Sequence, residues 1–348
     1  ELLIDPTVRP QKKPLPAVTL SGWRAQDDAK RIVILGSAGA GKSTALRKLY
    51  LEYQKEWTIG EPVPLMIHAA DLLSILEANK GPMLDIYGAP IGRSLVLRDS
   101  ERFYLFVDGM DEVEPNSARM IFERFILPKQ KYGPTIVCCR TATYEELFST
   151  SDAVSSWVDE CLVLESWDPE RDAFKFINSC ASKFHAPHIA EASRKLAADD
   201  GGFSSLLRTP FYCVLIVVIL LYDSTVGREV FLNSYTLYLH FYKSWATREL
   251  HRGTSTLSYS VLQRAHWELA CILYQRRGRA VTFAEVSEII GHPEDDMRRS
   301  SAFRDLILIE QDRLLESWLA KRFLHETLLE FFVARAILDS IEQGGLTL

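Results

Sequence analysis

The chain has 348 residues and a formal net charge of −6; 47% of its residues are hydrophobic and 25% are charged. This composition suits a globular protein of two or three domains, and the negative charge argues against a general nucleic-acid or anionic-membrane surface. The longest apolar run, residues 211–222, has 12 residues, too few to span a bilayer, so we expect no membrane partner. The six cysteines show no metal-ligand spacing, which predicts reduced thiols in a cytoplasmic protein.

The chain begins with a proline-rich segment and continues into alternating strands and helices. Residues 1–28 carry four of the 15 prolines, which favours an extended lead-in over a helix. Residues 29–166 alternate apolar runs with helical patterns, which predicts βαβ units and a parallel sheet. Helices are expected at 43–57 and 116–125, among others. The expected strands are Ile32–Leu35, Pro64–His68, Phe103–Asp108, Thr135–Cys139 and Cys161–Leu164.

A glycine-rich loop between the first expected strand and the first expected helix carries the strongest chemical signal. It fits the phosphate-binding pattern G-x-x-x-x-G-K-[ST] in full; the alternative is a chance Gly/Ala-rich turn. Successive backbone N–H groups and a helix N-terminus would point at one phosphate, with a Lys42 cation for the β and γ phosphates and a Ser43 hydroxyl for Mg²⁺. The residues predicted to bind a nucleoside triphosphate or diphosphate are Gly36, Ser37, Ala38, Gly39, Ala40, Gly41, Lys42, Ser43 and Thr44.

A second nucleotide signature follows an apolar strand that ends in an acid. A Mg²⁺ site beside a phosphate loop needs such an acid, so Asp108 is predicted to bind the metal together with Ser43; the alternative is an ordinary strand that ends in a polar turn. Asp111 and Glu112 lie where a carboxylate could orient or deprotonate an attacking water. Both are candidate catalytic residues, and the sequence leaves open which one acts and which one only holds the loop.

Arg140 closes the expected strand Thr135–Cys139. The carboxyl ends of parallel strands share the edge of a sheet at which ligands bind, so an arginine there could contact the γ-phosphate and report its presence. The alternative is a surface arginine at a strand end. Arg140 is therefore the third candidate catalytic residue.

Beyond residue 166 the pattern is helical. Asp168 with Pro169, and Thr209 with Pro210, have the form of a helix cap followed by proline at the first helical position. The helix that starts at Pro210 is apolar all round, which predicts burial at the centre of a helical domain over 167–230. Helices followed by a short hairpin are typical of a winged-helix domain, which we place at 231–348. Its expected elements are helices at 235–250, 261–274 and 325–341, and a strand, turn and second strand within 306–316.

The sequences G-x-A-G-x-G-K-S-T and D-G-M-D-E resemble the motifs of the NACHT family of signal-transduction ATPases, which includes NOD-like receptors and bacterial defence proteins. The acids two and three residues beyond Gly109 separate NACHT modules from most other P-loop proteins. Cys139 stands before Arg140 where the family has Ser or Thr.

Two later segments also resemble this family. Residues 207–210 resemble its helical-domain motif, whose proline, here Pro210, packs near the adenine. Residues 323–332 resemble its winged-helix motif, in which a histidine, here His325, reaches the β-phosphate of ADP. Read without the resemblance, Pro210 is a helix-starting proline and His325 a core histidine.

The resemblance implies an α/β P-loop NTPase domain followed by a helical domain and a winged-helix domain, with ATP or ADP and Mg²⁺ as ligands. Closed around ADP, the protein would be inactive; exchange for ATP would release the winged helix and permit self-assembly, and slow hydrolysis would reset the switch. A role in innate immunity or anti-phage defence is implied, with effector and sensor domains outside this fragment.

Two other functions stay open at this point. A P-loop enzyme with rapid turnover would need an acceptor-substrate site, and none is visible; a GTPase is disfavoured because residues 79–82 lack the aspartate that reads guanine. A winged-helix DNA-binding regulator would need a basic surface. Residues 246–348 carry 13 Lys and Arg against 15 acids, which argues against a nucleic-acid partner.

Overall fold

The computed structural model divides into two compact units, which we call the N-terminal unit (Asp5–Glu165) and the C-terminal unit (Ser166–Asp312 with Ser317–Leu348). Each helix in the described part of the chain falls short of the length and apolar character that a membrane span needs. The structure describes residues 7–10, 18–19, 31–59, 61–78, 84–86, 95–97, 103–127, 135–149, 156–199, 201–223, 225–251, 258–275, 281–282, 287–288, 291, 308–311, 320–323 and 326–342.

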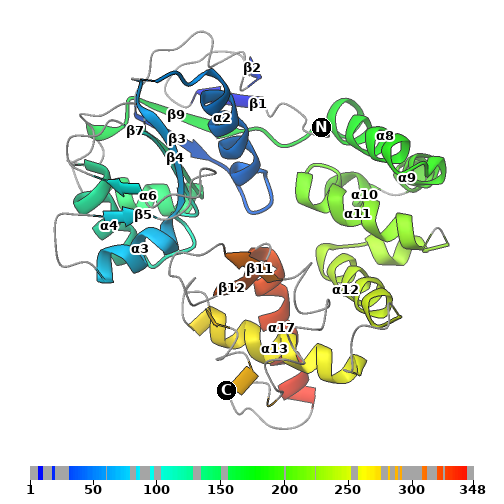
Figure 1. Ribbon diagram of the computed structural model, residues 1–348. Helices are drawn as coiled ribbons and strands as arrows, with labels where there is room; N and C mark the ends of the chain where they lie inside the picture. Colours follow the sequence, from blue (N-terminus) through cyan, green and yellow to red (C-terminus); the bar gives the residue numbers. More distant parts are fainter. Residues whose placement is uncertain are drawn as a thin grey trace. The chain divides into compact units, whose positions relative to one another are not determined.

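The N-terminal unit is built on a sheet with five parallel strands in the order β9-β3-β8-β7-β4 (Figure 1). All five expected strands are confirmed. Their near-continuous apolar runs are what strands covered on both faces require, and β8 is buried at every residue. The bounds are β3 Arg31–Leu35, β4 Val63–His68, β7 Phe103–Asp108, β8 Thr135–Cys139 and β9 Glu160–Leu164.

The lead-in contributes two strands that the sequence pattern did not reveal. Strand β1 (Thr7–Pro10) pairs antiparallel with β9, and β2 (Val18–Thr19) pairs with the first two residues of β1. Pro10 lies beyond the residues that pair with β2, where the missing N–H of proline costs little. The two described segments of the lead-in are therefore part of the sheet.

Helices cover both faces of the sheet, and the side chains of each strand alternate between them. Ile32 and Ile34 of β3 pack with Leu46 and Leu49 of α2 on one face. Val33 and Leu35 face the opposite cluster, to which α3, α4 and α6 contribute (Figure 1). The helices expected at 43–57 and 116–125 are confirmed, the second with a π-helical continuation. The bounds are α2 Lys42–Glu56, α3 Ala69–Ala78, α4 Pro115–Ile121, η1 Phe122–Ile126 and α6 Thr141–Ser149; a separate two-stranded sheet joins β5 Leu84–Ile86 and β6 Leu95–Leu97.

The C-terminal unit is mainly helical, and its expected helix starts are confirmed. Asp168 accepts a hydrogen bond from the Arg171 backbone N–H at 2.7 Å, and the π-helical turn that it caps begins at Pro169. Helix α11 begins at Pro210, and six of its residues are buried, as its all-apolar sequence predicts. The bounds are η2 Pro169–Ala173, α8 Phe174–Lys183, α9 Pro187–Asp199, α10 Gly201–Leu206, α11 Pro210–Tyr222, η3 Arg228–Phe231, α12 Ser234–His251, α13 Tyr259–Gln275 and α17 Glu326–Glu342.

A small antiparallel sheet accompanies the last helices. Strand β12 (Ala320–Phe323) lies between β10 (Val281–Thr282) and β11 (Leu308–Gln311), and α17 contacts β12, α13 and α12. The first strand of the expected hairpin is confirmed. Its expected return within 312–316 lies outside the described residues, and the strand that pairs with β11 is β12. Helices with a short antiparallel sheet form the winged-helix part of the fold.

One hydrophobic core runs through the C-terminal unit. It joins Phe203 and Ile216 of the helical part with Trp245, Leu269 and Phe332 of the last helices. The domain boundary at residue 230 stays a prediction, because these residues belong to one continuous cluster.

Candidate functional site

The loop after β3 has the backbone geometry that its glycines predict. Gly39 and Gly41 have φ of 73° and 93°, in the left-handed region that favours glycine. Gly36 is crowded instead, because a Cβ there would lie 3.2 Å from the Ala40 Cβ. The loop closes through the Ala40 N–H, which donates to the Ser37 carbonyl at 3.2 Å, and α2 begins directly after Gly41. The loop thus brings a helix N-terminus to the carboxyl edge of the sheet.

Lys42 lies along this loop rather than extending into solvent. Its Nζ donates to the carbonyls of Gly36 at 3.1 Å and Ser37 at 3.2 Å, and only 12% of the side chain is exposed. Ser43 and Thr44, next along the first turn of α2, are exposed. The structure therefore brings an ammonium group and accessible residues with hydroxyl side chains to the same end of the helix.

Asp108 ends β7 and is buried at 9% exposure. Gly109 follows with φ of 70°, and the Met110 N–H donates to the Cys138 carbonyl at 3.3 Å. This hydrogen bond ties the turn after β7 to β8, the strand that separates β7 from β3. Asp108 therefore lies two strands from the loop, on the same sheet edge.

Three predicted site residues meet around one carboxylate oxygen. Oδ2 of Asp111 lies 3.1 Å from Nε of Arg140 and 3.8 Å from Nζ of Lys42. The Asp111 side chain is 4% exposed, and its burial raises the pKa of the carboxyl, an effect that Lys42 and Arg140 oppose and Glu112 reinforces. Since Arg140 follows β8 and Lys42 follows the loop after β3, these contacts place Asp111 on the β8 side of β7.

Glu112 faces the other way. Its Oε2 lies 3.2 Å from Nε2 of His68, the last residue of β4, and β4 pairs with β7 on the side opposite β8. Nδ1 of His68 accepts a hydrogen bond from the Ala70 N–H at 3.3 Å, so in the neutral ring Nε2 carries the proton that faces Glu112. The two candidate acids therefore point to opposite sides of β7.

His68 is the residue of this edge that the sequence did not single out. It was expected only as the end of the strand Pro64–His68, yet the register of β4 and β7 places it beside Asp108. A signal was present, because carboxyl ends of parallel strands gather at the ligand-binding edge. Which strand would neighbour β7 was not readable from the sequence.

Three buried cysteines lie in the central strands of the sheet. Cys138 and Cys139 lie in β8 and Cys161 lies in β9, and none forms a disulfide. Burial raises the pKa of Cys138 and of Cys139, so both stay protonated and poorly reactive at neutral pH. Cys139, just before Arg140, therefore acts as a small apolar residue.

Two predicted ligand residues belong to the C-terminal unit. Pro210 is the first residue of α11, and the Arg208 carbonyl near it accepts a hydrogen bond from the Trp167 N–H at 3.0 Å. His325 lies outside the described residues; α17 begins at the next residue, Glu326. The predicted roles of both remain proposals.

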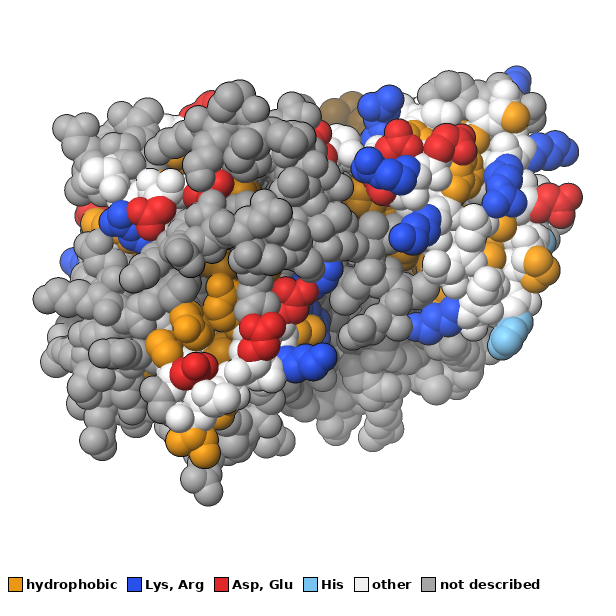
Figure 2. Space-filling model, turned by 90° about the horizontal axis from the view of Figure 1, so that it is seen from above, with side chains coloured by type: hydrophobic (Ala, Val, Ile, Leu, Met, Phe, Trp, Pro, Cys, Tyr) orange, Lys and Arg blue, Asp and Glu red, His pale blue; other side chains and the backbone are white. Residues whose placement is uncertain are grey.

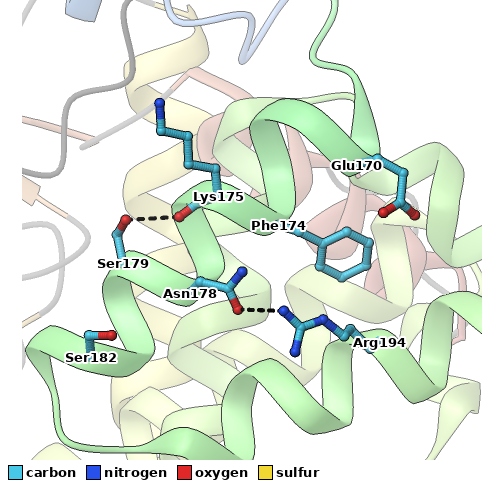
Figure 3. Close-up of a pocket in the computed structure, with 7 residues that line it drawn as sticks. All are labelled: Glu170, Phe174, Lys175, Asn178, Ser179, Ser182 and Arg194. Atoms are coloured by element: carbon cyan, nitrogen blue, oxygen red, sulfur yellow. Dashed lines mark hydrogen bonds between the residues drawn. The ribbon is translucent and has the colours of Figure 1, made fainter.

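A surface hollow of about 470 Å³ lies in the C-terminal unit, between α8 and α9 (Figure 3). Two hydrogen bonds join its lining residues: Arg194 donates to the Asn178 side-chain oxygen at 3.1 Å, and the Ser179 hydroxyl donates to the Lys175 carbonyl at 2.8 Å. The residues that line it are Glu170, Phe174, Lys175, Asn178, Ser179, Ser182 and Arg194.

No family model and no curated protein sequence matches the chain. Among solved structures it is similar to the Orc1 protein of Aeropyrum pernix, solved in complex with DNA, at 13% identity and a TM-score of 0.39, covering 92% of this chain and 91% of that one. Cdc6p of Pyrobaculum aerophilum gives 14% identity, a TM-score of 0.36 and 92% coverage of both chains. RuvB T158V of Thermotoga maritima gives 13% identity and a TM-score of 0.32, with 88% of this chain and 89% of that one covered. At these scores the overlap is loose, and the fold described above rests on the strand order and the loop geometry of this chain.

Proposed function

We propose that the chain binds ATP and ADP with Mg²⁺ at the loop of residues 36–44 and acts as a nucleotide-controlled switch of the NACHT type. The observation that carries this proposal is the loop itself: two glycines with positive φ lead into α2, and Lys42 is held at the same point by the carbonyls of Gly36 and Ser37. This arrangement suits the binding of phosphate groups, because a helix N-terminus and a cation lie together at the end of a glycine-rich loop.

The residues present fit a nucleotide and its metal ion. The loop amides and Lys42 would hold the β and γ phosphates, while the exposed Ser43 and the Asp108 carboxylate at the end of β7 offer oxygen ligands of the kind that Mg²⁺ prefers. When bound, Mg²⁺ supplies positive charge that offsets the charge of the phosphates. In this proposal Asp108 and Ser43 are metal ligands, and Gly36 to Thr44 form the phosphate cradle.

The contacts of the two acids support different roles for them. Asp111 faces Lys42 and Arg140, so it is the better placed of the two to orient a water near the terminal phosphate. Glu112 faces His68 and would need another side-chain rotamer to reach that side. Arg140, within reach of the same carboxylate, is proposed to contact the γ-phosphate.

The switch itself rests on the resemblance of the motifs to the NACHT family. In this proposal Pro210 packs near the adenine and His325 reaches the β-phosphate of ADP, so the C-terminal unit closes over the diphosphate. Exchange for ATP would release it and permit self-assembly, and slow hydrolysis would restore the closed state. The output would be innate immunity or anti-phage defence, with effector and sensor domains as partners of these 348 residues.

A nucleotide titration tests the proposal. Purified protein, stripped of nucleotide, is titrated with ATP, ADP and GTP in the presence of Mg²⁺. We expect saturable binding of both adenine nucleotides, weaker binding of GTP, and turnover slower than one per second, at the low end of the range of enzymes. Failure to bind ATP and ADP would overturn the proposed function, and fast turnover would favour a P-loop enzyme.

The alternative function is that of a DNA-binding regulator, and a gel-shift assay with duplex DNA tests it. Basic and acidic side chains both appear on the coloured part of the face shown in Figure 2, and the last 103 residues, 246–348, carry more acids than bases. Non-specific DNA binding depends on clustered cations and weakens as salt rises. We expect no salt-sensitive shift of duplex DNA in a gel; a clear one would favour the regulator.

A further inference from the structure

Asp111 shares one oxygen between the two cations that the proposed function assigns to the phosphates. Oδ2 lies 3.8 Å from the Lys42 ammonium and 3.1 Å from Nε of Arg140. Oδ1 is buried and has no hydrogen-bond partner among the described residues. The two ion pairs on Oδ2 therefore offset part of the cost of burying this carboxylate.

The surroundings limit the access of solvent to these ion pairs. The Asp111 side chain is 4% exposed, that of Lys42 12% and that of Arg140 29%, so solvent screens their interactions less than at an open surface. A second anion that uses the same cations must share them with the carboxylate, and it also meets the carboxylate as a like charge. The cost grows with the charge that the anion brings to this point.

ATP and ADP differ in that charge. Both carry a β-phosphate, which the loop amides and Lys42 can meet, but only ATP brings a γ-phosphate toward Arg140. We propose that Asp111 is a specificity-determining residue, which lowers the affinity for ATP relative to ADP by competing with the γ-phosphate for Lys42 and Arg140. This inference rests on the proposed function, since it assumes that the loop binds these nucleotides.

The consequence is a bias toward the diphosphate state. A ligand shifts a two-state protein only by its difference in affinity for the two states. With Asp111 in place, the nucleotide-bound protein holds ADP unless ATP is in excess. The residue thus sets the threshold of the switch from within the nucleotide-binding unit.

The test is the ratio of two dissociation constants. Asp111→Asn keeps the size of the side chain and removes its charge. The Kd for ATP and the Kd for ADP are measured by titration in EDTA, so that neither Mg²⁺ nor hydrolysis intervenes. We expect Kd(ATP)/Kd(ADP) to fall by about tenfold, as removal of one charge close to a partly buried phosphate implies, mainly through tighter ATP binding.

Glu114→Gln is the matched control. It removes one negative charge three residues further on, at the N-cap of α4, where the residue is partly exposed, and should leave the ratio within about twofold of the wild type, since solvent and salt screen a partly exposed charge more than a buried one. An unchanged ratio in Asp111→Asn, or an equal fall in both variants, would overturn the inference. Wild-type protein that binds neither nucleotide would instead overturn the proposed function.

A double-mutant cycle tests whether Asp111 acts through Arg140. It also provides a second test of the inference if Asp111→Asn alone disturbs the fold. Arg140→Gln alone should weaken ATP binding more than ADP binding. In the double variant, Asp111→Asn should change the ratio by less than it does beside Arg140, because one of the contested cations is gone. Additive effects in variants with wild-type circular dichroism would contradict competition for Arg140.

Discussion

The imidazole of His68 lies against both Gly109 and Glu112. Its Nε2 is 3.2 Å from Oε2 of Glu112, and a Cβ at Gly109 would lie 2.6 Å from Cε1 of the ring and closer still to Nε2. The small residue after Asp108 therefore makes room for a side chain of the neighbouring strand. This packing links the turn after β7 to β4 and gives the glycine of D-G-M-D-E a structural reason.

Gly109→Ala is expected to destabilise the N-terminal unit. The residue has φ of 70° and no space for a Cβ. The free energy of unfolding should therefore fall by about 2–4 kcal/mol, because the left-handed backbone and the overlap with His68 both add to the cost. Urea unfolding followed by hydrogen exchange in β7 would measure it.

Gly291→Ala provides the comparison, because Gly291 has φ of 68° and none of the described residues lies within 4 Å of a Cβ there. Gly291→Ala should lower the free energy of unfolding by about 1–2 kcal/mol, the cost of a left-handed backbone conformation without any overlap. Adding His68→Ala to Gly109→Ala should restore the part of the unfolding free energy that is lost through overlap of the new Cβ with the His68 ring. Equal losses at the two glycines would show that His68 does not constrain the turn.

Lys42→Ala should abolish or severely weaken nucleotide binding. Loss of a charge-assisted phosphate contact is worth about 2–4 kcal/mol, or about 30- to 1,000-fold in affinity. Equilibrium titration with ADP measures the change. Arg47→Ala, an exposed cation on the same helix, should bind as the wild type does; near-normal affinity in a folded Lys42→Ala protein would remove the basis for the phosphate cradle.

Asp108→Asn should separate binding from metal-dependent hydrolysis. We expect ADP binding in EDTA to persist, while Mg²⁺-dependent hydrolysis falls by about 100-fold or more, because the variant loses a negatively charged metal ligand. Asp71→Asn, in the first turn of α3, is the control for a lost acid elsewhere in the unit. If Asp108→Asn loses ADP binding and hydrolysis to the same extent, Asp108 is a structural residue.

His325→Ala should weaken the hold on ADP. A contact that the diphosphate state uses and the triphosphate state does not is what a switch requires, and its loss should speed ADP release by about tenfold or more. Stopped-flow release of a fluorescent ADP, with light scattering to follow self-association, measures both effects. The control is His240→Ala, which changes a histidine of α12 whose Nε2 lies 3.8 Å from Oδ2 of Asp223. Identical ADP release from the wild type and His325→Ala would favour the interpretation of His325 as a core histidine without a role in nucleotide binding.

Much of the N-terminal unit was predictable because its signals are local. Each strand of the parallel sheet is a nearly continuous apolar run, and the loop motif marks the start of α2 by itself. Pro210 marks the start of α11 in the C-terminal unit in the same local way. The elements that were missed depend on pairing with distant residues: β1 and β2 gain their identity from β9 and from each other, and β10 is two residues long.

The same distinction applies to the site. Lys42, Asp108 and Arg140 could be named from their positions at strand and helix ends. The roles of the two acids could not be separated, because that depends on the strand order β8-β7-β4, which sends Asp111 toward Arg140 and Glu112 toward His68. The π-helical turn Phe122–Ile126 likewise has no signal in the sequence.

The nucleotide that co-purifies with the protein is the most direct measure of what this chain does. Protein purified without added nucleotide is denatured, and the released material is separated by ion-exchange chromatography and quantified against the protein. We predict ADP as the main species, retained by the wild type and absent from Lys42→Ala. Wild-type protein that releases no nucleotide, and that then binds neither ATP nor ADP on titration, would contradict a nucleotide switch.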